Sequence, residues 1–277
     1  MSNLLIVSII VTLFVSFILP LAFLVGYALR HKRQGIWSAW LLGALGFFVP
    51  QILIRLPILT GLSQSAGFAA FAQNHPVAYG FGLAFTAGLF ELAGRYAVAR
   101  CLKKNLTCRR ALAAGLGHGG IEAILITGLA YLSNVVILVM LQTGGFDAVL
   151  TQTGDASQLL AARDALVNTH WALFLLAGYE RLLAMTCHVA MSMMVCYGVH
   201  TNRVLPWTLA CLAVHTCMDF IASISLFIGR GLTLAAAYTI IYILLTAITI
   251  LSILILQNIR TRWAAETAQE VPYDSQA

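Results

Sequence analysis

Long apolar runs, separated by short polar stretches, recur along the whole chain of 277 residues. Seven of these runs reach the roughly 20 residues that a helix needs to cross the hydrocarbon core of a bilayer. They cover residues 4–29, 36–58, 77–99, 110–142, 170–199, 205–228 and 232–257. The pattern therefore predicts an all-α, polytopic membrane protein with about seven transmembrane helices.

The polar connectors are short, with one exception at 143–169. Within that connector, the sequence DASQLLAARDALV (155–167) predicts a short amphipathic helix that lies at the membrane interface. The polar composition of residues 261–277 predicts a disordered cytoplasmic tail. We therefore expect a single integral membrane domain over residues 1–260.

The charged residues set the expected orientation of the spans. Only 9% of the residues are charged, against about 25% in a soluble domain, so the net charge of +6 indicates loop orientation and not nucleic-acid binding. Eleven basic residues fall on one face: Arg30, Lys32, Arg33, Arg100, Lys103, Lys104, Arg109, Arg110, Arg203, Arg260 and Arg262. The other face has only Arg163 and Arg230. Because basic loops stay inside, the N-terminus is predicted outside and the C-terminus in the cytoplasm.

Ten ionisable side chains lie inside the predicted spans, where each costs several kcal/mol unless it is paired or hydrated. They are Arg55, Glu91, Arg95, His118, Glu122, Glu180, Arg181, His188, His215 and Asp219. With a rise of about 1.5 Å per residue, six of them lie roughly 12–21 Å from the basic ends of their helices. These six are Glu91, His118, Glu122, His188, His215 and Asp219. Four helices are thus expected to bring three histidines and three carboxylates into one layer.

This layer has the residue types of a zinc site. HxxxE at His118 and HxxxD at His215 each place two ligand groups one helical turn apart, on one helix face. Three histidines with an open position for water suit Zn²⁺, and Glu91 or Glu122 can act as the general base. Gly119 and Gly120 would let a neighbouring helix approach the histidine. Proton or ion transport uses similar residues, so a carrier and a non-catalytic scaffold remain alternatives to an enzyme.

The remaining groups have structural interpretations. Arg95, one turn from Glu91, is expected to keep that carboxylate ionised. Arg55, Glu180 and Arg181 lie nearer the outer boundary, and an ion pair between Glu180 and Arg55 is expected to join two helices.

Four blocks of sequence together resemble the YhfC family of intramembrane metalloproteases, which is grouped with the PrsW proteases and the CPBP (CAAX-processing and bacteriocin-immunity) proteins. The blocks are FELAGRY (90–96), GHGGIEA (117–123), ERLLAMTCH (180–188) and HTCMD (215–219). The resemblance covers roughly residues 1–260 and implies a CPBP-like core of four helices that carries the polar site.

The resemblance also implies roles for individual residues. Glu91 matches the catalytic glutamate of the group and Arg95 its basic companion, while His188, His215 and Asp219 match the downstream motifs. His118 and Glu122 match a block particular to YhfC-like members, and the pair Glu180–Arg181 recurs with His188. The group usually has two adjacent acids in its first motif, and here the second position is Leu92.

The function that the resemblance implies is hydrolysis of a peptide bond near the cytoplasmic side of the bilayer. His118, His188 and His215 would bind Zn²⁺, or stabilise the oxyanion in a metal-free reaction driven by a glutamate-activated water. Glu91, Glu122 and Asp219 form the catalytic set, with Arg95, Glu180 and Arg181 in support. The expected partners are the lipid bilayer and a membrane-associated peptide or protein, with no nucleic acid, in the bacterial inner membrane.

Overall fold

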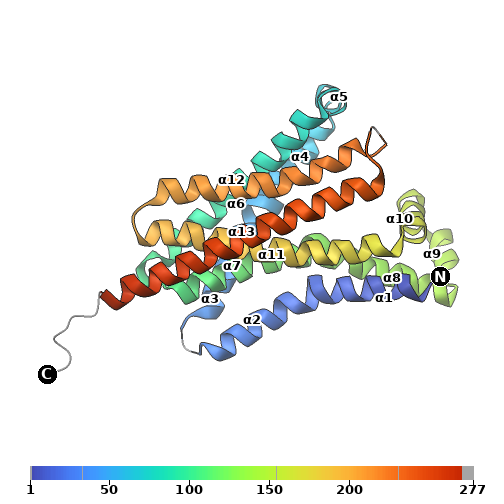
Figure 1. The fold of residues 1–277 in the computed structure, drawn as a ribbon. Helices are drawn as coiled ribbons and strands as arrows, with labels where there is room; N and C mark the ends of the chain where they lie inside the picture. The colour runs from blue at the N-terminus through green and yellow to red at the C-terminus, as the bar shows by residue number, and fades with distance from the viewer. Residues whose placement is uncertain (1, 33, 154, 230, 270–277) are drawn as a thin grey trace. The chain divides into compact units, whose positions relative to one another are not determined.

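The computed structural model describes residues 2–32, 34–153, 155–229 and 231–269, and within these ranges it contains helices and no named strand (Figure 1). Seven helices are long and apolar enough to cross a membrane. Their bounds are Asn3–Arg30, Ile36–Ser63, Pro76–Asn105, Cys108–Thr143, Trp171–His200, Val204–Phe227 and Leu234–Ala268. The predicted all-α class and the seven spans are therefore confirmed, whereas the orientation of the spans stays a prediction.

Three of the spans are interrupted by a π-helical segment, which the hydrophobic pattern did not reveal. The first span consists of α1 (Asn3–Leu13), η1 (Phe14–Ile18) and α2 (Leu19–Arg30); the second of α3 (Ile36–Phe47), η2 (Phe48–Arg55) and α4 (Leu56–Ser63); the fourth of α7 (Cys108–Glu122), η4 (Ala123–Gly128) and α8 (Leu129–Thr143). Pro50 lies inside η2, where it removes one backbone donor from the helix. Arg55 ends η2 and Glu122 precedes η4, so two of the intramembrane charges lie at such irregular turns.

The other helices test two expectations about the polar segments, a helix at 155–167 and disorder from residue 261. They are α5 (Ala66–Asn74), α6 (Pro76–Leu102), η3 (Lys103–Asn105), α9 (Gly145–Gln152), α10 (Ser157–Asn168), α11 (Trp171–His200), α12 (Val204–Ile221), η5 (Ala222–Phe227) and α13 (Leu234–Gln269). Helix α10 confirms the helix predicted at 155–167, and α9 was not predicted. Helix α13 continues through Gln269, so the expectation of disorder was wrong for 261–269, while 270–277 lie outside the described residues.

The contacts of the chain divide it into two compact units, and the expectation of one membrane domain over 1–260 stays a prediction. Unit 1 consists of Met1–Phe23 and Glu122–Leu182, and unit 2 of Leu24–Ile121 and Leu183–Ala277. In unit 1, α1 packs on α8 and η1 on η4. Thr12 Oγ1 and Tyr131 Oη both donate to the carbonyl of Phe174, at 2.7 and 3.1 Å, which ties α1 and α8 to α11.

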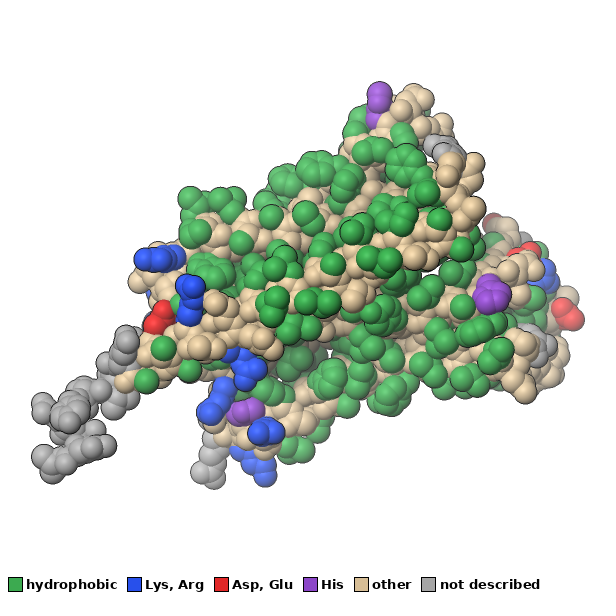
Figure 2. Space-filling model, in the orientation of Figure 1, with side chains coloured by type: hydrophobic (Ala, Val, Ile, Leu, Met, Phe, Trp, Pro, Cys, Tyr) green, Lys and Arg blue, Asp and Glu red, His purple; other side chains and the backbone are tan. Residues whose placement is uncertain are grey.

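Unit 2 is organised around α6, which packs against α3, η2 and α12. Met191, Met193 and Val195 of α11 are fully buried in its apolar core. The outer surface is also apolar: large side chains such as Leu205 and Ile243 are exposed, and Figure 2 shows hydrophobic side chains spread over the helices. An apolar exterior over such long helices is what a lipid environment requires.

Glycines bring the backbones of unit 2 into direct contact. A Cβ atom on Gly94 of α6 would lie 1.9 Å from the carbonyl oxygen of Gly46 in α3, and one on Gly117 of α7 would lie 2.0 Å from the carbonyl oxygen of Trp40. Small residues are the usual means of packing membrane helices closely, because lipid supplies no hydrophobic force between them. These contacts fix the spacing of α6 and α7 around α3.

The close approach of α3 and α6 predicts that Gly94→Ala lowers the thermal unfolding temperature of the detergent-purified protein. Overpacking of this kind costs about 1–3 kcal/mol because backbones must separate. Gly82→Ala in the same helix is the matched control, since nothing lies within 4 Å of a Cβ atom there. Equal unfolding temperatures for the two variants would contradict the packing described.

Candidate active site

One carboxylate, that of Glu91 in α6, is the centre of a buried polar group in unit 2. Its Oε2 atom lies 3.0 Å from His118 Nε2, 3.8 Å from His188 Nδ1 and 3.7 Å from His215 Nε2. The side chains come from α6, α7, α11 and α12, and all four residues are at most 3% exposed. The predicted convergence of these residues in one layer is confirmed.

Arg95, one turn after Glu91 on α6, supplies the positive charge of this group. Its Nη2 atom donates to Glu91 Oε2 at 3.2 Å and to His188 Nδ1 at 2.5 Å. An arginine has only donors, so Nδ1 of His188 is an acceptor and the proton of the neutral ring lies on Nε2. Arg95 therefore fixes the tautomer of His188 as well as neutralising Glu91, a wider role than the sequence predicted.

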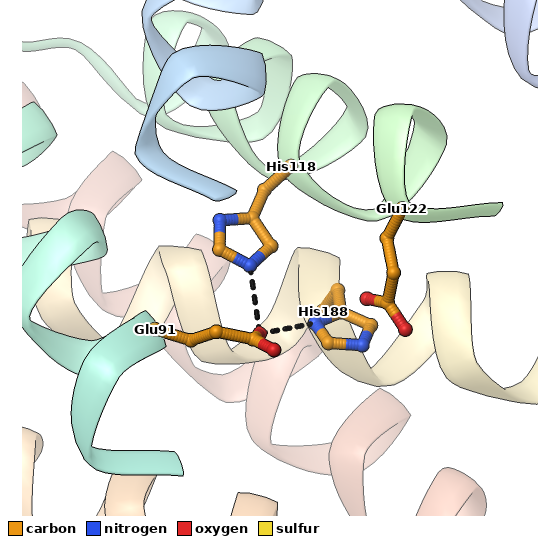
Figure 3. A group of neighbouring side chains, drawn as sticks. All are labelled: Glu91, His118, Glu122 and His188. Atoms are coloured by element: carbon orange, nitrogen blue, oxygen red, sulfur yellow. Dashed lines mark hydrogen bonds and ion pairs between the residues drawn. The ribbon is translucent and has the colours of Figure 1, made fainter. Parts of the chain in front are cut away.

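The approach of α7 and α11 depends on Gly119, beside His118. A Cβ atom on Gly119 would lie 3.0 Å from His188 Cβ and 3.2 Å from the Cα of Met185. The two imidazole rings stack with centroids 5.4 Å apart, and Figure 3 shows both histidines directed at Glu91. The expectation that Gly119 lets a neighbouring helix approach is thus confirmed.

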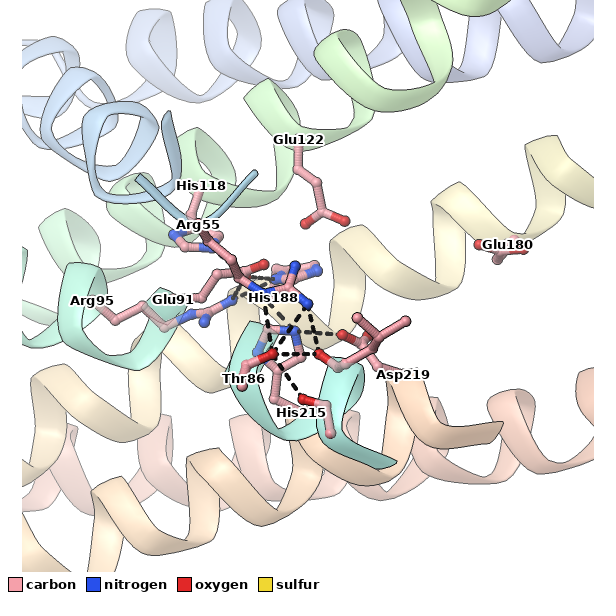
Figure 4. Close-up of polar contacts among 12 residues, drawn as sticks. Arg55, Thr86, Glu91, Arg95, His118, Glu122, Glu180, His188, His215 and Asp219 are labelled. Atoms are coloured by element: carbon pink, nitrogen blue, oxygen red, sulfur yellow. Dashed lines mark hydrogen bonds and ion pairs between the residues drawn. The ribbon is translucent and has the colours of Figure 1, made fainter. Parts of the chain in front are cut away.

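His215 and Asp219 form a second part of the site on α12. His215 Nε2 lies 3.4 Å from Asp219 Oδ2, one turn further along the helix, and 3.7 Å from Glu91 Oε2. The imidazole is thus between two carboxylates (Figure 4). The side chain of Asp219 is 32% exposed, against 4% for Glu91, so the polar group reaches the surface of unit 2 at Asp219.

Arg55 lies closer to this site than expected. Its guanidinium donates to Thr86 Oγ1 at 3.3 Å and to the carbonyl oxygen of Leu83 at 2.7 Å, and it is 7% exposed. Thr86 precedes Glu91 by five residues, about 7.5 Å along α6. Within the described residues Arg55 forms no ion pair and its hydrogen-bond partners are neutral, while the nearby charges of Asp219 and Glu91 act on its guanidinium.

Arg55 and Glu180, which were expected to form an ion pair, belong to different units, so that pair stays a prediction. In unit 1, Arg181 binds Glu180 at 2.5 Å and Glu122 at 3.1 Å, so one guanidinium bridges two carboxylates from α11 and α7. Glu122 itself lies on the turn of α7 after His118 (Figure 3). Sequence reasoning missed both the Arg181–Glu122 pair and the involvement of Thr86, since neither has a motif.

Leu92 is the position at which the resemblance implied a second acid. Its side chain is half-buried against the apolar cluster that contains Cys211 and Met194. A carboxylate at this position would lie among apolar neighbours and not beside the histidines. The contacts described for Glu91 therefore do not depend on an acid at this position.

The donor atoms at the centre fit a metal ion such as zinc. Glu91, His118 and His188 each offer one ligand atom, and these atoms lie within 4.8 Å of one another. Ligands on a tetrahedral zinc stand about 3.4 Å apart for bonds of about 2.1 Å, so donor atoms separated by up to 4.8 Å would have to move closer together on binding. Arg95 sets a condition: because it occupies the Nδ1 lone pair of His188, it has to release that ring before His188 can bind metal.

Seven membrane helices, four of which carry three buried histidines and a carboxylate, define a multi-pass membrane protein with a buried polar centre. The profile of the YhfC intramembrane metalloprotease family matches residues 15–243, and the chain belongs to this family. It is similar to the uncharacterized membrane protein YhfC of Bacillus subtilis (strain 168), with 33% identity over 239 residues, 85% of this chain and 90% of that protein. No solved structure matches the chain.

The ion pair at the centre predicts that Glu91→Gln destabilises the protein strongly. Removing one partner of a buried pair leaves the charge of Arg95 uncompensated, a loss of about 3–5 kcal/mol. Thermal unfolding in detergent measures the effect. The double variant Glu91→Gln with Arg95→Met is expected to recover part of the loss, because it removes both charges.

The control for this prediction is Asp164→Asn, which breaks the exposed pair between Arg163 and Asp164. Its effect is expected below about 0.5 kcal/mol. If the double variant is as unstable as the sum of its two single variants, Glu91 and Arg95 do not act as a pair.

Proposed function

We propose that this protein is an intramembrane endopeptidase that hydrolyses a peptide bond near the cytoplasmic side of the bilayer. The observation that supports this proposal most is the single buried carboxylate of Glu91 with three imidazole nitrogens within 3.0–3.8 Å. Membership of a family named for metalloprotease activity agrees with it. The substrate is a membrane-associated peptide or protein, and the membrane is the bacterial cytoplasmic membrane.

The residues of the centre have the properties that peptide hydrolysis requires. Glu91 takes a proton from the attacking water and returns it to the nitrogen of the leaving amine. His118 and His188 flank the carboxylate and can donate to the oxygen that becomes negative in the transition state. Asp219 orients His215, since the two are 3.4 Å apart.

Zinc, when bound, would polarise the scissile carbonyl and lower the pKa of a bound water to about 7. His118 and His188 would hold it, with either Glu91 or His215 as a further ligand. If Glu91 were a ligand, Glu122, which follows His118 by one turn, would be the alternative general base. If no metal is bound, Arg95 already supplies a fixed positive charge beside Glu91, at 3.2 Å.

Arg55 is well placed to bind the substrate. A buried guanidinium at membrane depth is costly when its partners are neutral, as Thr86 and the Leu83 carbonyl are. A peptide carbonyl or carboxylate that enters at the exposed Asp219 side would satisfy the remaining donors. We assign Arg55 this substrate-binding role and not a part in the proton transfer.

Metal content and cleavage test the proposed activity on one detergent-purified sample. The wild type is expected to contain nearly one zinc ion per chain, measured by inductively coupled plasma mass spectrometry. The double variant His188→Ala with His215→Ala is expected to lose both this zinc and cleavage of the substrate. Glu91→Gln is expected to lower cleavage by about 10²–10⁴, the usual contribution of a general base. The substrates are single-span reporter peptides in liposomes. A fluorophore and a quencher flank the half of the span that corresponds to the cytoplasmic side, so cleavage there separates them.

His75→Ala with His170→Ala is the control pair, because both side chains are exposed and lie outside the polar layer. Cleavage without metal that still requires Glu91 would assign the reaction to a glutamate-activated water. Neither metal nor cleavage, in a wild-type sample shown to be folded, would contradict the peptidase and favour a scaffold.

Arg55→Gln is expected to raise KM for the reporter peptides by about tenfold with a smaller effect on kcat, because a charged hydrogen bond to the substrate contributes about 1.5–3 kcal/mol. Arg55→Lys should recover part of the affinity, since it keeps the charge but not the forked donors. Equal falls in kcat for both variants, with KM unchanged, would exclude a binding role.

A further inference from the structure

A second polar region of unit 2 is formed by the ends of five spans and the connectors between them. It is a groove of about 2210 Å³, with lining residues that include Tyr27, Arg30, Arg109, Arg110, Arg260 and Trp263. These residues come from the end of α2, the start of α7 and the last turns of α13, and residues 34–35, 105–107 and 200 complete the wall. Figure 2 shows Lys and Arg side chains gathered at the ends of α2 and α13.

The charged side chains that line this groove are basic. Four arginines line it, and none of its described lining residues is Asp or Glu. Their described hydrogen-bond partners are neutral: Arg109 donates to Gln34 Oε1 at 3.1 Å, and Arg110 donates to the carbonyl oxygen of Asn105 at 3.1 Å. In the part of the chain that the structure describes, Nε of Arg110 is buried without a hydrogen-bond partner, and none of the four arginines forms an ion pair.

The backbone makes room for this convergence at Gly35. This residue has φ = 66°, a left-handed conformation that favours glycine, and a Cβ atom on it would lie 3.3 Å from Arg110 Nε. Basic loops need no such arrangement to orient a membrane protein, since charges anywhere on them are sufficient. Lys103 and Lys104 are basic loop residues of this ordinary kind, because both are exposed and neither lines the groove.

We propose that this groove binds the headgroup of an anionic phospholipid, independently of the proposed peptidase activity. Arginines bind phosphate oxygens through paired donors, and basic pockets between membrane helices on the cytoplasmic side are suited to such headgroups. The ends of the spans place the groove at the depth of the lipid headgroups. Tyr27 and Trp263 are residue types that favour this interface, and Leu106 and Leu112 offer apolar contact to the glycerol and the first acyl carbons.

Native mass spectrometry of the full chain in a non-ionic detergent tests the proposal. Phosphatidylglycerol and phosphatidylcholine with the same acyl chains are added in turn to delipidated protein. We expect the wild type to retain phosphatidylglycerol preferentially. Arg30→Gln with Arg260→Gln should weaken this binding about 30-fold, since each basic residue near the membrane surface contributes about 1 kcal/mol.

Lys103→Gln with Lys104→Gln is the matched control, because it removes the same charge from the same side outside the groove. Equal losses in the two double variants, or equal retention of the two lipids, would overturn the proposal. Inorganic phosphate that displaces the lipid at equal concentration would assign the groove to a free anion instead. If lipid binds only after removal of residues 270–277, which include Glu270 and Asp274, that segment occupies the groove and the proposal fails.

Discussion

A carboxylate at membrane depth is stable only where the protein supplies the hydrogen bonds and the opposite charge that water would otherwise provide. Glu91 meets this condition through Arg95 on its own helix and through three histidines on three other helices. The constraint acts on the fold as well as on the site. Four helices have to approach closely enough for these side chains to meet, and the approach of α7 to α11 requires a glycine beside His118.

The position of Arg95 links the stability of this centre to its chemistry. Its guanidinium stays positively charged and donates to Glu91, so it compensates the negative charge of that carboxylate whether or not a metal ion is present. The same guanidinium occupies the Nδ1 lone pair of His188. Metal binding by His188 and the Arg95–His188 hydrogen bond are therefore mutually exclusive, and the side chain of Arg95 decides between the two proposed mechanisms.

The charges of unit 2 fall into two groups with different surroundings. At the centre, acids and bases are buried together and compensate one another, as membrane-embedded ionisable groups must. At the ends of the spans, four arginines line a groove that has no acid among its described lining residues. A catalytic group needs partners that hold it in one position. A site that binds and releases a lipid instead needs N–H groups that can donate to the phosphate. The neutral partners of Arg109 and Arg110 fit the second requirement.

The amino-acid sequence by itself determined the seven spans and the common depth of Glu91, His118, His188 and His215. This was possible because the bilayer fixes the length of a span and a helix rises by a constant 1.5 Å per residue, so position in the sequence converts directly into depth. Only the tertiary structure decided which partners the charged groups choose. Within unit 2, Arg55 binds Thr86, and within unit 1, Arg181 binds Glu122 and Glu180.

The physical reason is that direction around a helix axis, unlike depth, is not fixed by counting residues. Each additional residue in a π-helical turn rotates the following side chains by about 100°, and such segments end at Arg55 and begin after Glu122. The end of α13 is a second feature that the sequence did not predict, because its last turns are polar in sequence yet helical through Gln269. Trp263 there is buried and stacks on His200, and such contacts exist only once distant helices have packed together.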